Sequence, residues 1–387
     1  MQNQYELDIY ALAYGGKGIG MLDGMVCFVE GALPGEKVRF IKQSEKKKFI
    51  NGRVREIITA SPDRAEPICS HYGRCGGCQY QHLKYEKEVF YKAEQAQSIL
   101  SRIGGFKEYD FQGITPSTSQ YNYRSSITLH RSSSAYGYFA KDNRTIIPIE
   151  QCPLAREEIN SAIPTLFAKS KKDNVTMKCD KSGNVYIGGY PGHRFYKEDF
   201  LETELTFSPL AFTQPNREIA SAIVETLRAW IGKEDREVLF DLYCGAGFFG
   251  ILLRDMFKTV IGIDESGVAT DCAKTSKKAL GAGNVTFYQG DADDRTPVYY
   301  EKLRGKVNTI LIDPPRTGIS GELAAYLAGL KDASSLYYIS CDPAILARDA
   351  RILTRDGAWK LERVASFDMF PRTKHVESIA LFKRPIS

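Results

Sequence analysis

The stretch "EVLFDLYCGAGFFG", residues 237–250, decides the fold of this chain. A short apolar run ends at Asp241, and a glycine-rich loop follows it. Apolar, strand-like runs then alternate with helical patterns: "TVIGID", "NVTFYQGD", "NTILID", "SLYYIS", "LERVASFD" and "ESIALFKR". This alternation is typical of β-α units, so we predict an α/β fold with a mostly parallel sheet.

Polar residues follow these runs at the points where the strands should end. In such sheets, ligands bind outside the carboxyl ends of the strands. The residues at these ends are Tyr243, Asp264, Asp291, Asp313 and Cys341. We therefore expect a thiol to share one crevice with several acids.

The loop Gly245-x-Gly247-x-x-Gly250 fits two kinds of cofactor. With Asp264 at the end of the next strand, it matches a dinucleotide fingerprint, in which the acid binds ribose hydroxyls. Methyltransferases that use S-adenosylmethionine (SAM) place glycines and an acid in the same way. The stretch "ILIDPPRTG" favours SAM, because a rigid Asp-Pro-Pro loop carries polar groups toward a planar base and has no task in hydride transfer.

Cys341, in "YISCDPAILARD", is the candidate nucleophile. Carbon 5 of a pyrimidine is a weak nucleophile, and a thiolate that adds to carbon 6 activates it for methylation. A general base must then remove the carbon-5 proton. His375 and Glu377, in "DMFPRTKHVESI", are the candidate bases. The alternative is that all three are structural, since a cysteine at the end of a buried strand is common.

The first sixty residues alternate polar and apolar side chains between glycine-rich turns, which predicts a small antiparallel β-barrel. Eight basic residues and one acid, Glu45, lie between Lys37 and Arg55. A basic edge of this kind suits a nucleic-acid backbone, and its candidate contacts are Lys46, Lys47 and Lys48. A solvated loop explains the same charges equally well.

Four cysteines mark the middle of the chain. Cys69-x5-Cys75-x2-Cys78 is followed much later by Cys152. Nine cysteines without a secretion signal indicate a reducing cytoplasm, where such a cluster holds metal more often than it forms disulfides. The spacing fits zinc or an iron–sulfur cluster and by itself slightly favours zinc.

The length and composition of the chain limit its possible domain organisation. A chain of 387 residues with 43% apolar content should form two or three domains, which we place at 1–60, 61–210 and 211–387. No apolar run is long enough to cross a membrane. The net charge of +5 permits a polyanionic partner without requiring one. We expect a cytoplasmic monomer.

Taken together, the chain resembles the RNA uracil-C5 methyltransferase family, whose members make 5-methyluridine. The similarity covers nearly the whole chain, in the family's order: "FSPLAFTQPN", "DLYCGAGFFGI", "GDAD", "DPPRTG", "YISCDPAILARD" and "DMFPRTKHVE". It implies a Rossmann-like catalytic domain, Cys341 as nucleophile and Glu377 as base. The residues implied to line the SAM and uracil site are Gln214, Tyr243, Asp264, Asp291 and Asp313, beside Gly245 and Gly247 of the loop.

The resemblance also implies the parts that bind RNA. The barrel resembles a TRAM domain, and "YNYRSSITLH" resembles an RNA-contacting segment of the central domain, with Arg124 and Arg131 as phosphate contacts. "CGGCQYQHL" implies a [4Fe–4S] cluster on the four cysteines. The implied substrate is 23S rRNA, with tRNA as the alternative, and the target uridine must be extruded from its stack.

Three residues depart from the family's pattern. Asp342 replaces the usual Asn after the cysteine, and its charge should raise the pKa of the thiol unless the side chain caps the following helix. Asp264 replaces a common Glu, which shortens the reach to the ribose. Phe248 stands where some members have Asn, so one cofactor contact is expected to be missing.

Other classes of protein are weaker alternatives. RNA cytosine-C5 enzymes carry a further cysteine in the fourth-strand motif, and "DPPRTG" has none. Exocyclic-amine methyltransferases have an aromatic residue where Arg316 follows the prolines. A non-catalytic RNA-binding or assembly protein of the same fold is favoured only by Asp342, and a dehydrogenase only by the glycine loop.

Overall fold

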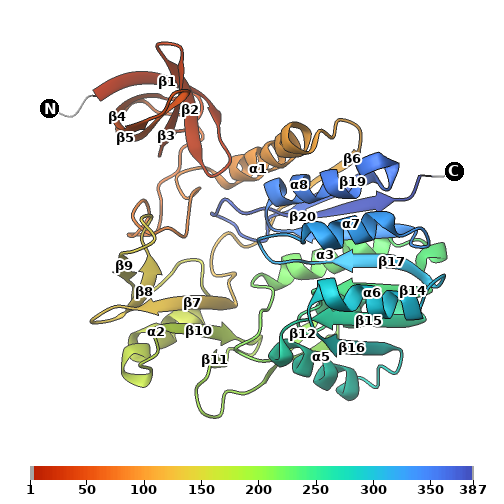
Figure 1. Ribbon diagram of the computed structural model, residues 1–387. Helices are drawn as coiled ribbons and strands as arrows, with labels where there is room; N and C mark the ends of the chain where they lie inside the picture. The colour runs from red at the N-terminus through yellow and green to blue at the C-terminus, as the bar shows by residue number, and fades with distance from the viewer. Residues whose placement is uncertain (1–3, 386–387) are drawn as a thin grey trace. The chain divides into compact units, whose positions relative to one another are not determined.

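The computed structural model describes residues 4–385. The chain forms two compact units, each assembled from segments that are distant in sequence (Figure 1). Of the described residues, the first unit comprises 4–95 together with 138–147 and 370–375, and the second comprises 96–137, 148–369 and 376–385.

The first unit contains a closed five-stranded barrel, as the sequence predicts (red in Figure 1). It is not wholly antiparallel as predicted, because the strands at residues 25–30 and 49–59 pair in parallel. Around the barrel the strands follow the order β1-β2-β3-β5-β4. Inward-facing side chains such as Leu7, Val29 and Phe40 alternate with exposed ones and form the core. A Cβ at position 52 would lie 2.3 Å from the Phe40 ring, so only glycine leaves room for that ring. The strands are β1 (Gln4–Leu12), β2 (Lys17–Leu22), β3 (Met25–Glu30), β4 (Lys37–Glu45) and β5 (Phe49–Thr59).

The middle of the chain forms a five-stranded sheet with the order β11-β10-β7-β8-β9 (yellow to light green in Figure 1). Its strands are β7 (Ser126–Arg131), β8 (Tyr136–Phe139), β9 (Ile146–Pro148), β10 (Asn174–Cys179) and β11 (Val185–Ile187). The helices of this stretch and the one before it are α1 (Tyr85–Ile99), η1 (Leu100–Gly104) and α2 (Glu157–Lys169). A separate hairpin pairs β12 (Tyr196–Phe200) with β13 (Thr203–Phe207).

The second unit contains an eight-stranded sheet with the order β16-β15-β14-β17-β18-β20-β19-β6. Five neighbouring strands run parallel, from β16 to β18, and β20 then runs antiparallel to both β18 and β19. The predicted α/β class is thereby confirmed. One strand was not predicted, since β6 comes from far upstream and pairs in parallel with β19. The strands are β6 (Asp110–Thr115), β14 (Val238–Leu242), β15 (Thr259–Asp264), β16 (Val285–Gln289), β17 (Val307–Ile312), β18 (Ser335–Ser340), β19 (Lys360–Phe367) and β20 (Glu377–Lys383).

Helices connect the parallel strands, and the strands themselves are apolar on both faces. The helices are α3 (Arg217–Trp230), η2 (Lys233–Asp235), α4 (Phe248–Leu252), η3 (Arg254–Met256), α5 (Gly267–Ala279), α6 (Ala292–Lys302), α7 (Gly321–Gly329), α8 (Pro343–Leu353) and η4 (Arg355–Gly357). Between residues 4 and 385, no helix has the length and apolar character needed to cross a membrane.

Candidate active site

The carboxyl ends of the parallel strands meet at one edge, because their registers match. Leu242 pairs with both Ile263 and Ile312, and Ile312 pairs with Tyr338. Asp264, Asp313 and Cys341 are therefore brought to the same edge of the sheet, as predicted from their positions after the strands.

The glycine-rich loop is tied to the end of β15. Both carboxylate oxygens of Asp264 accept backbone N–H groups, from Gly245 and from Ser266, each at 2.9 Å. Gly245 has a φ of 55°, and a Cβ there would meet no atom within 4 Å. The backbone at this position is thus exposed to an open space into which a ligand can come close.

The rest of the loop is tightly packed. Gly247 has a φ of 77°, and a Cβ there would lie 2.6 Å from Phe287. Tyr243, at the start of the loop, also has a positive φ, 61°, a strained conformation of the kind that gathers at functional sites. Phe248 is buried and packs edge-to-face on Phe200, so the position where some family members have Asn is part of the apolar core here.

Asp241 is fully buried beneath the loop. Its Oδ2 accepts the Gly250 N–H at 2.9 Å, and its Oδ1 has no hydrogen-bond partner within residues 4–385. Burial raises the pKa of this carboxyl well above its usual value, and the charges of Asp313 and Asp264 add to the effect. Burial therefore favours the protonated, uncharged form of this carboxyl.

Cys341 and Glu377 are neighbours through the antiparallel pairing of β18 and β20. Ser340 is opposite Ser378 in the last pair of the ladder, and Cys341 and Glu377 are the residues that adjoin this pair on the two chains. Burial raises the pKa of Cys341 to about 12, and the charge of Glu377 contributes. Burial also raises the pKa of Glu377 well above its usual value, with a further contribution from Asp313.

Arg316 is a site residue that the sequence interpretation did not select. Its guanidinium lies close enough to the Cys341 thiol to oppose the rise in the pKa of that thiol. It also counteracts the rise in the pKa of Glu377. The sequence feature that could have identified Arg316 is its position directly after Asp-Pro-Pro, on the loop that follows β17.

Asp342 is the N-cap of α8. Its Oδ1 accepts the Ala344 N–H at 2.8 Å, and Pro343 occupies the first helical position. The main charges that raise the pKa of Cys341 are those of Glu377 and Asp313. Asp342 therefore caps the helix, which is the arrangement in which its charge is not expected to raise the pKa of the neighbouring thiol.

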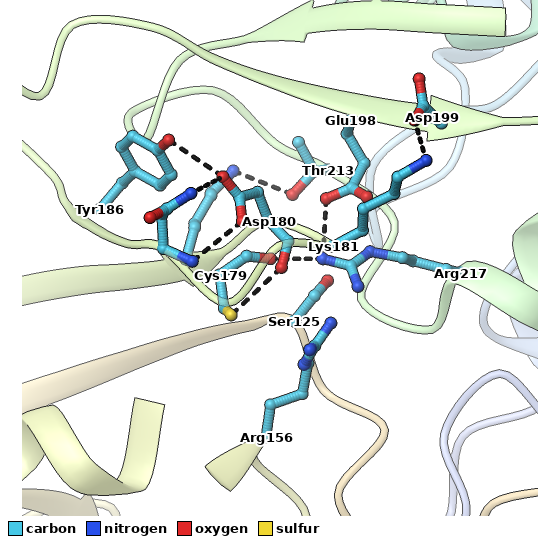
Figure 2. A network of polar contacts seen from close by, with 12 residues as sticks. Ser125, Arg156, Cys179, Asp180, Lys181, Tyr186, Glu198, Asp199, Thr213 and Arg217 are labelled. Atoms are coloured by element: carbon cyan, nitrogen blue, oxygen red, sulfur yellow. Dashed lines mark hydrogen bonds and ion pairs between the residues drawn. The ribbon is translucent and has the colours of Figure 1, made fainter. Parts of the chain in front are cut away.

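Gln214 is buried in a segment held by hydrogen bonds at several points. Lys178, on β10, donates to the Ala211 carbonyl and, at 3.0 Å, to Thr213 Oγ1. At the other end, Arg217 donates to the Cys179 carbonyl and to Glu198, at 2.5 and 2.7 Å (Figure 2). These contacts fix the backbone on both sides of Gln214.

Asp291 caps helix α6, and its Oδ1 accepts the Asp293 N–H at 2.7 Å. After burial, the charges of Asp293 and Asp291 are the main reason why the pKa of Tyr243 is raised. The charges of these two acids therefore act on the start of the glycine-rich loop.

A curated relative aligns with nearly the whole of this chain. The 23S rRNA (uracil(1939)-C(5))-methyltransferase RlmD of Aliivibrio fischeri is 30% identical over 425 aligned positions, which include 98% of this chain and 96% of the relative. The chain belongs to the RNA uracil-C5 methyltransferase family. The predicted class of enzyme, an RNA uracil-C5 methyltransferase, is confirmed with it.

Other comparisons agree with membership of this family. A family profile described as tRNA (Uracil-5-)-methyltransferase matches residues 202–385. An uncharacterized RNA methyltransferase of Aquifex aeolicus is 29% identical and covers 98% of both chains. The crystal structure of the Pyrococcus abyssi tRNA (uracil-54, C5)-methyltransferase in complex with S-adenosyl-L-homocysteine shares the fold, with a TM-score of 0.74 at 23% identity over 97% of this chain and 99% of that chain.

The cysteines predicted to bind metal are divided between the two units of this family member. Cys69, Cys75 and Cys78 belong to the first unit and Cys152 to the second. The Cys75 sulfur accepts the Gly77 N–H at 3.4 Å, and the Cys78 sulfur accepts the Gln81 side-chain amide at 3.2 Å. Within residues 4–385, no group of three or more His, Cys, Asp or Glu side chains is gathered as a metal site.

The predicted RNA contacts lie in different surroundings. The side chains of Lys46, Lys47 and Lys48 are exposed in the turn between β4 and β5. Arg124 is half-buried and donates to Tyr123 Oη at 3.3 Å. Arg131 packs 3.9 Å above the Phe167 ring and donates to the Ser170 carbonyl, so its guanidinium already has partners within the protein.

Proposed function

We propose that this chain methylates carbon 5 of a uridine in 23S rRNA with SAM as methyl donor. The observation that carries the proposal is that Cys341 and Glu377 adjoin the last pair of the β18–β20 ladder, Ser340 with Ser378, and that the charge of Arg316 acts on the thiol. This arrangement combines a nucleophile, a proton acceptor and a cation that favours the thiolate.

Each residue has a defined step. The Cys341 sulfur, without its proton, bonds to carbon 6 of uracil, and the electron pair of the 5,6 double bond moves toward carbon 5 and the O4 oxygen. SAM, when bound, would supply the methyl group that carbon 5 takes, and the electron pair of the broken S–C bond would stay on the departing S-adenosylhomocysteine. Glu377 then removes the carbon-5 proton, the double bond re-forms, and Cys341 leaves as a thiolate. Because its pKa is raised, the Glu377 carboxylate is a strong enough base for this carbon-bound proton.

The chain offers a fitting surface for SAM. The open space beside Gly245 accommodates a ligand against the backbone, and the carboxylate of Asp264 lies at the end of the adjacent strand. Asp241 leaves an oxygen without a partner within the described range. The residues proposed to hold SAM are Gln214, Tyr243, Gly245, Gly247, Asp264, Asp291 and Asp313.

The RNA is proposed to contact the barrel and the central region. Lys46, Lys47 and Lys48 would bind phosphates through their exposed ammonium groups, and Arg124 and Arg131 are proposed as further contacts. We place the barrel at 1–60, the central domain at 61–210 and the catalytic domain at 211–387, in a cytoplasmic monomer. The choice of 23S rRNA rests on the similarity to the Aliivibrio fischeri relative over nearly the whole length of both chains.

A tRNA is the second candidate substrate, because the shared fold with the Pyrococcus abyssi enzyme also extends over nearly the whole of both chains. A non-catalytic role has lost its support, since Asp342, the one feature that favoured it, caps a helix.

We propose that Cys69, Cys75, Cys78 and Cys152 bind a [4Fe–4S] cluster that is structural or positions RNA. Hydrogen bonds from N–H groups to two of the sulfurs suit thiolate ligands. Iron content and visible absorbance of protein purified without oxygen test the assignment, with Cys75→Ser expected to lose both. Zinc in place of iron would support the alternative metal.

The decisive experiment uses 23S rRNA fragments and tRNA transcripts with labelled SAM. We expect wild type to methylate one uridine of the rRNA and to form a stable adduct with 5-fluorouridine-substituted transcripts through Cys341. Cys341→Ala should abolish both, whereas Cys272→Ala, at a buried cysteine on α5, should retain them. Methylation by Cys341→Ala would refute the thiolate mechanism.

A further inference from the structure

The turn that carries Arg316 is closed by its own backbone. The Gly318 N–H donates to the Pro315 carbonyl at 2.8 Å, so Arg316 and Thr317 occupy the two central positions of a four-residue turn. Gly318 has a φ of 78°, which glycine adopts without strain. The turn therefore sets the direction in which the Arg316 side chain leaves the backbone.

Two adjacent side chains of α8 hold this turn. Arg348 donates from Nη2 to the Thr317 carbonyl at 2.8 Å. Asp349 accepts the Ile319 N–H at Oδ2, 3.1 Å away. Arg348 also donates from Nε to Asp349 Oδ1 at 2.7 Å, which joins the two contacts into one pair.

The pair fits closely against Gly318. A Cβ at position 318 would lie 2.3 Å from both Arg348 Nη2 and Asp349 Oδ2. Asp349 is fully buried, and Tyr338 of β18 donates its hydroxyl to Oδ2 at 2.5 Å. One carboxylate thus connects helix α8, strand β18 and the loop after β17.

The same helix begins directly after the nucleophile, since Cys341 is followed by the N-cap Asp342. Cys341 directly precedes the N-cap of α8, and Arg316 lies on the turn held by the second half of this helix, close enough for its charge to act on the Cys341 thiol. We propose that Arg348 and Asp349 are positioning residues that keep the Arg316 guanidinium beside the Cys341 sulfur. This inference rests on the proposed function in one respect only, because it is the proposed function that makes the Cys341 sulfur the nucleophile.

The test measures the reactivity of Cys341 toward iodoacetamide as a function of pH, read by mass spectrometry of the peptide that contains it. Alkylation follows the thiolate fraction, so Arg348→Ala should lower the rate at about pH 7.5 by roughly threefold to tenfold. Arg348 is half-exposed, so its truncation leaves little buried volume empty. Arg348→Lys, which keeps one donor, should restore part of the rate.

Arg351→Ala is the matched control. Arg351 is an exposed arginine three residues further along α8, and the structure gives it no ion pair or side-chain hydrogen bond among the residues it describes. This variant should react at the wild-type rate. A decrease equal to that of Arg348→Ala would show a general effect of charge on the helix and would overturn the proposal.

An Arg316→Gln background separates positioning from a general structural effect. If Arg348 acts through Arg316, then Arg348→Ala should cause no further loss in that background. An unchanged rate in the single variant, or the same fold-loss with and without Arg316, would overturn the proposal. Asp349→Asn should likewise lower the alkylation rate of Cys341 only when Arg316 is present. Urea unfolding checks that this variant remains folded. Because the readout needs no methyl transfer, a protein that methylated no RNA would refute the proposed function and leave this test intact.

Discussion

The two edges of the eight-stranded sheet have opposite effects on the pKa of their acids. At the amino edge, Asp235 accepts hydrogen bonds from Ser334, Ser335 and Lys383. Burial alone would raise its pKa, but these donors lower it below the usual value. At the carboxyl edge, burial raises the pKa of Asp313 to about 7, and the charge of Asp264 contributes.

Asp235 therefore has a structural role, whereas the acids at the carboxyl edge are available for chemistry. Asp235 has a donor for each oxygen and joins the start of β18 to the end of β20. At the opposite edge, Cys341 and Glu377 share the influence of Arg316, and Asp313 raises the pKa of both. Titratable groups left under-compensated in this way are typical of functional sites, and they lower the stability of the fold.

Glu377→Gln should give the largest effect at the carboxyl edge. Without a base, the carbon-5 proton cannot leave, so turnover should fall by roughly 10²–10⁴-fold while a methylated adduct with RNA accumulates. Gel shift under denaturing conditions and steady-state methylation measure the two effects. Glu362→Gln, at an exposed position of β19, is the control. Full turnover by Glu377→Gln would assign the base to another residue.

Asp235→Asn should weaken the fold and leave the chemistry unchanged. Loss of the charged partner of Lys383 should cost about 1–3 kcal/mol in the free energy of unfolding at pH 7. Because the folded-state pKa of Asp235 is lowered, its contribution is present above the unfolded-state pKa and is lost as pH falls through the folded value. Urea unfolding at neutral and acidic pH should therefore show a difference from wild type that disappears in acid.

Asp313→Asn should have the opposite effect on stability. Because the folded-state pKa is raised, the stability that Asp313 contributes is present below its unfolded-state pKa and is lost as pH rises through about 7. Above that pH the variant should be more stable than wild type by roughly 1–2 kcal/mol, a figure reduced for the partial exposure of the side chain. Its affinity for SAM should fall. A variant less stable than wild type at about pH 8 would contradict the contrast between the edges.

Asp342→Asn should give the smallest effect, because Asn and Asp cap helices almost equally well. We expect kcat/KM and the pH dependence of Cys341 alkylation to stay within about threefold of wild type. A large gain in thiol reactivity would mean that the charge of Asp342 acts on the sulfur as well as on the helix.

Much of the fold could be predicted because its signals are local. Alternating runs predicted the barrel and the β-α units, and strand ends predicted which acids would meet at one edge. Strand β6 escaped prediction because it pairs with β19, some 250 residues later, and nothing within "DFQGIT" indicates that partner. Arg316 escaped because its contact with Cys341 depends on how two loops from different strands approach each other.

By itself, the sequence determined the order of strands and helices, the glycine-rich loop and the presence of a thiol after β18, since these depend on periodicity and on neighbouring residues. Only the tertiary structure decided that Glu377 and Cys341 meet at the end of the β18–β20 ladder, that Asp342 turns toward the helix and that Arg348 and Asp349 hold the turn of Arg316. The physical reason is that burial and charge set a pKa through groups that are distant in the chain and meet only in the folded protein.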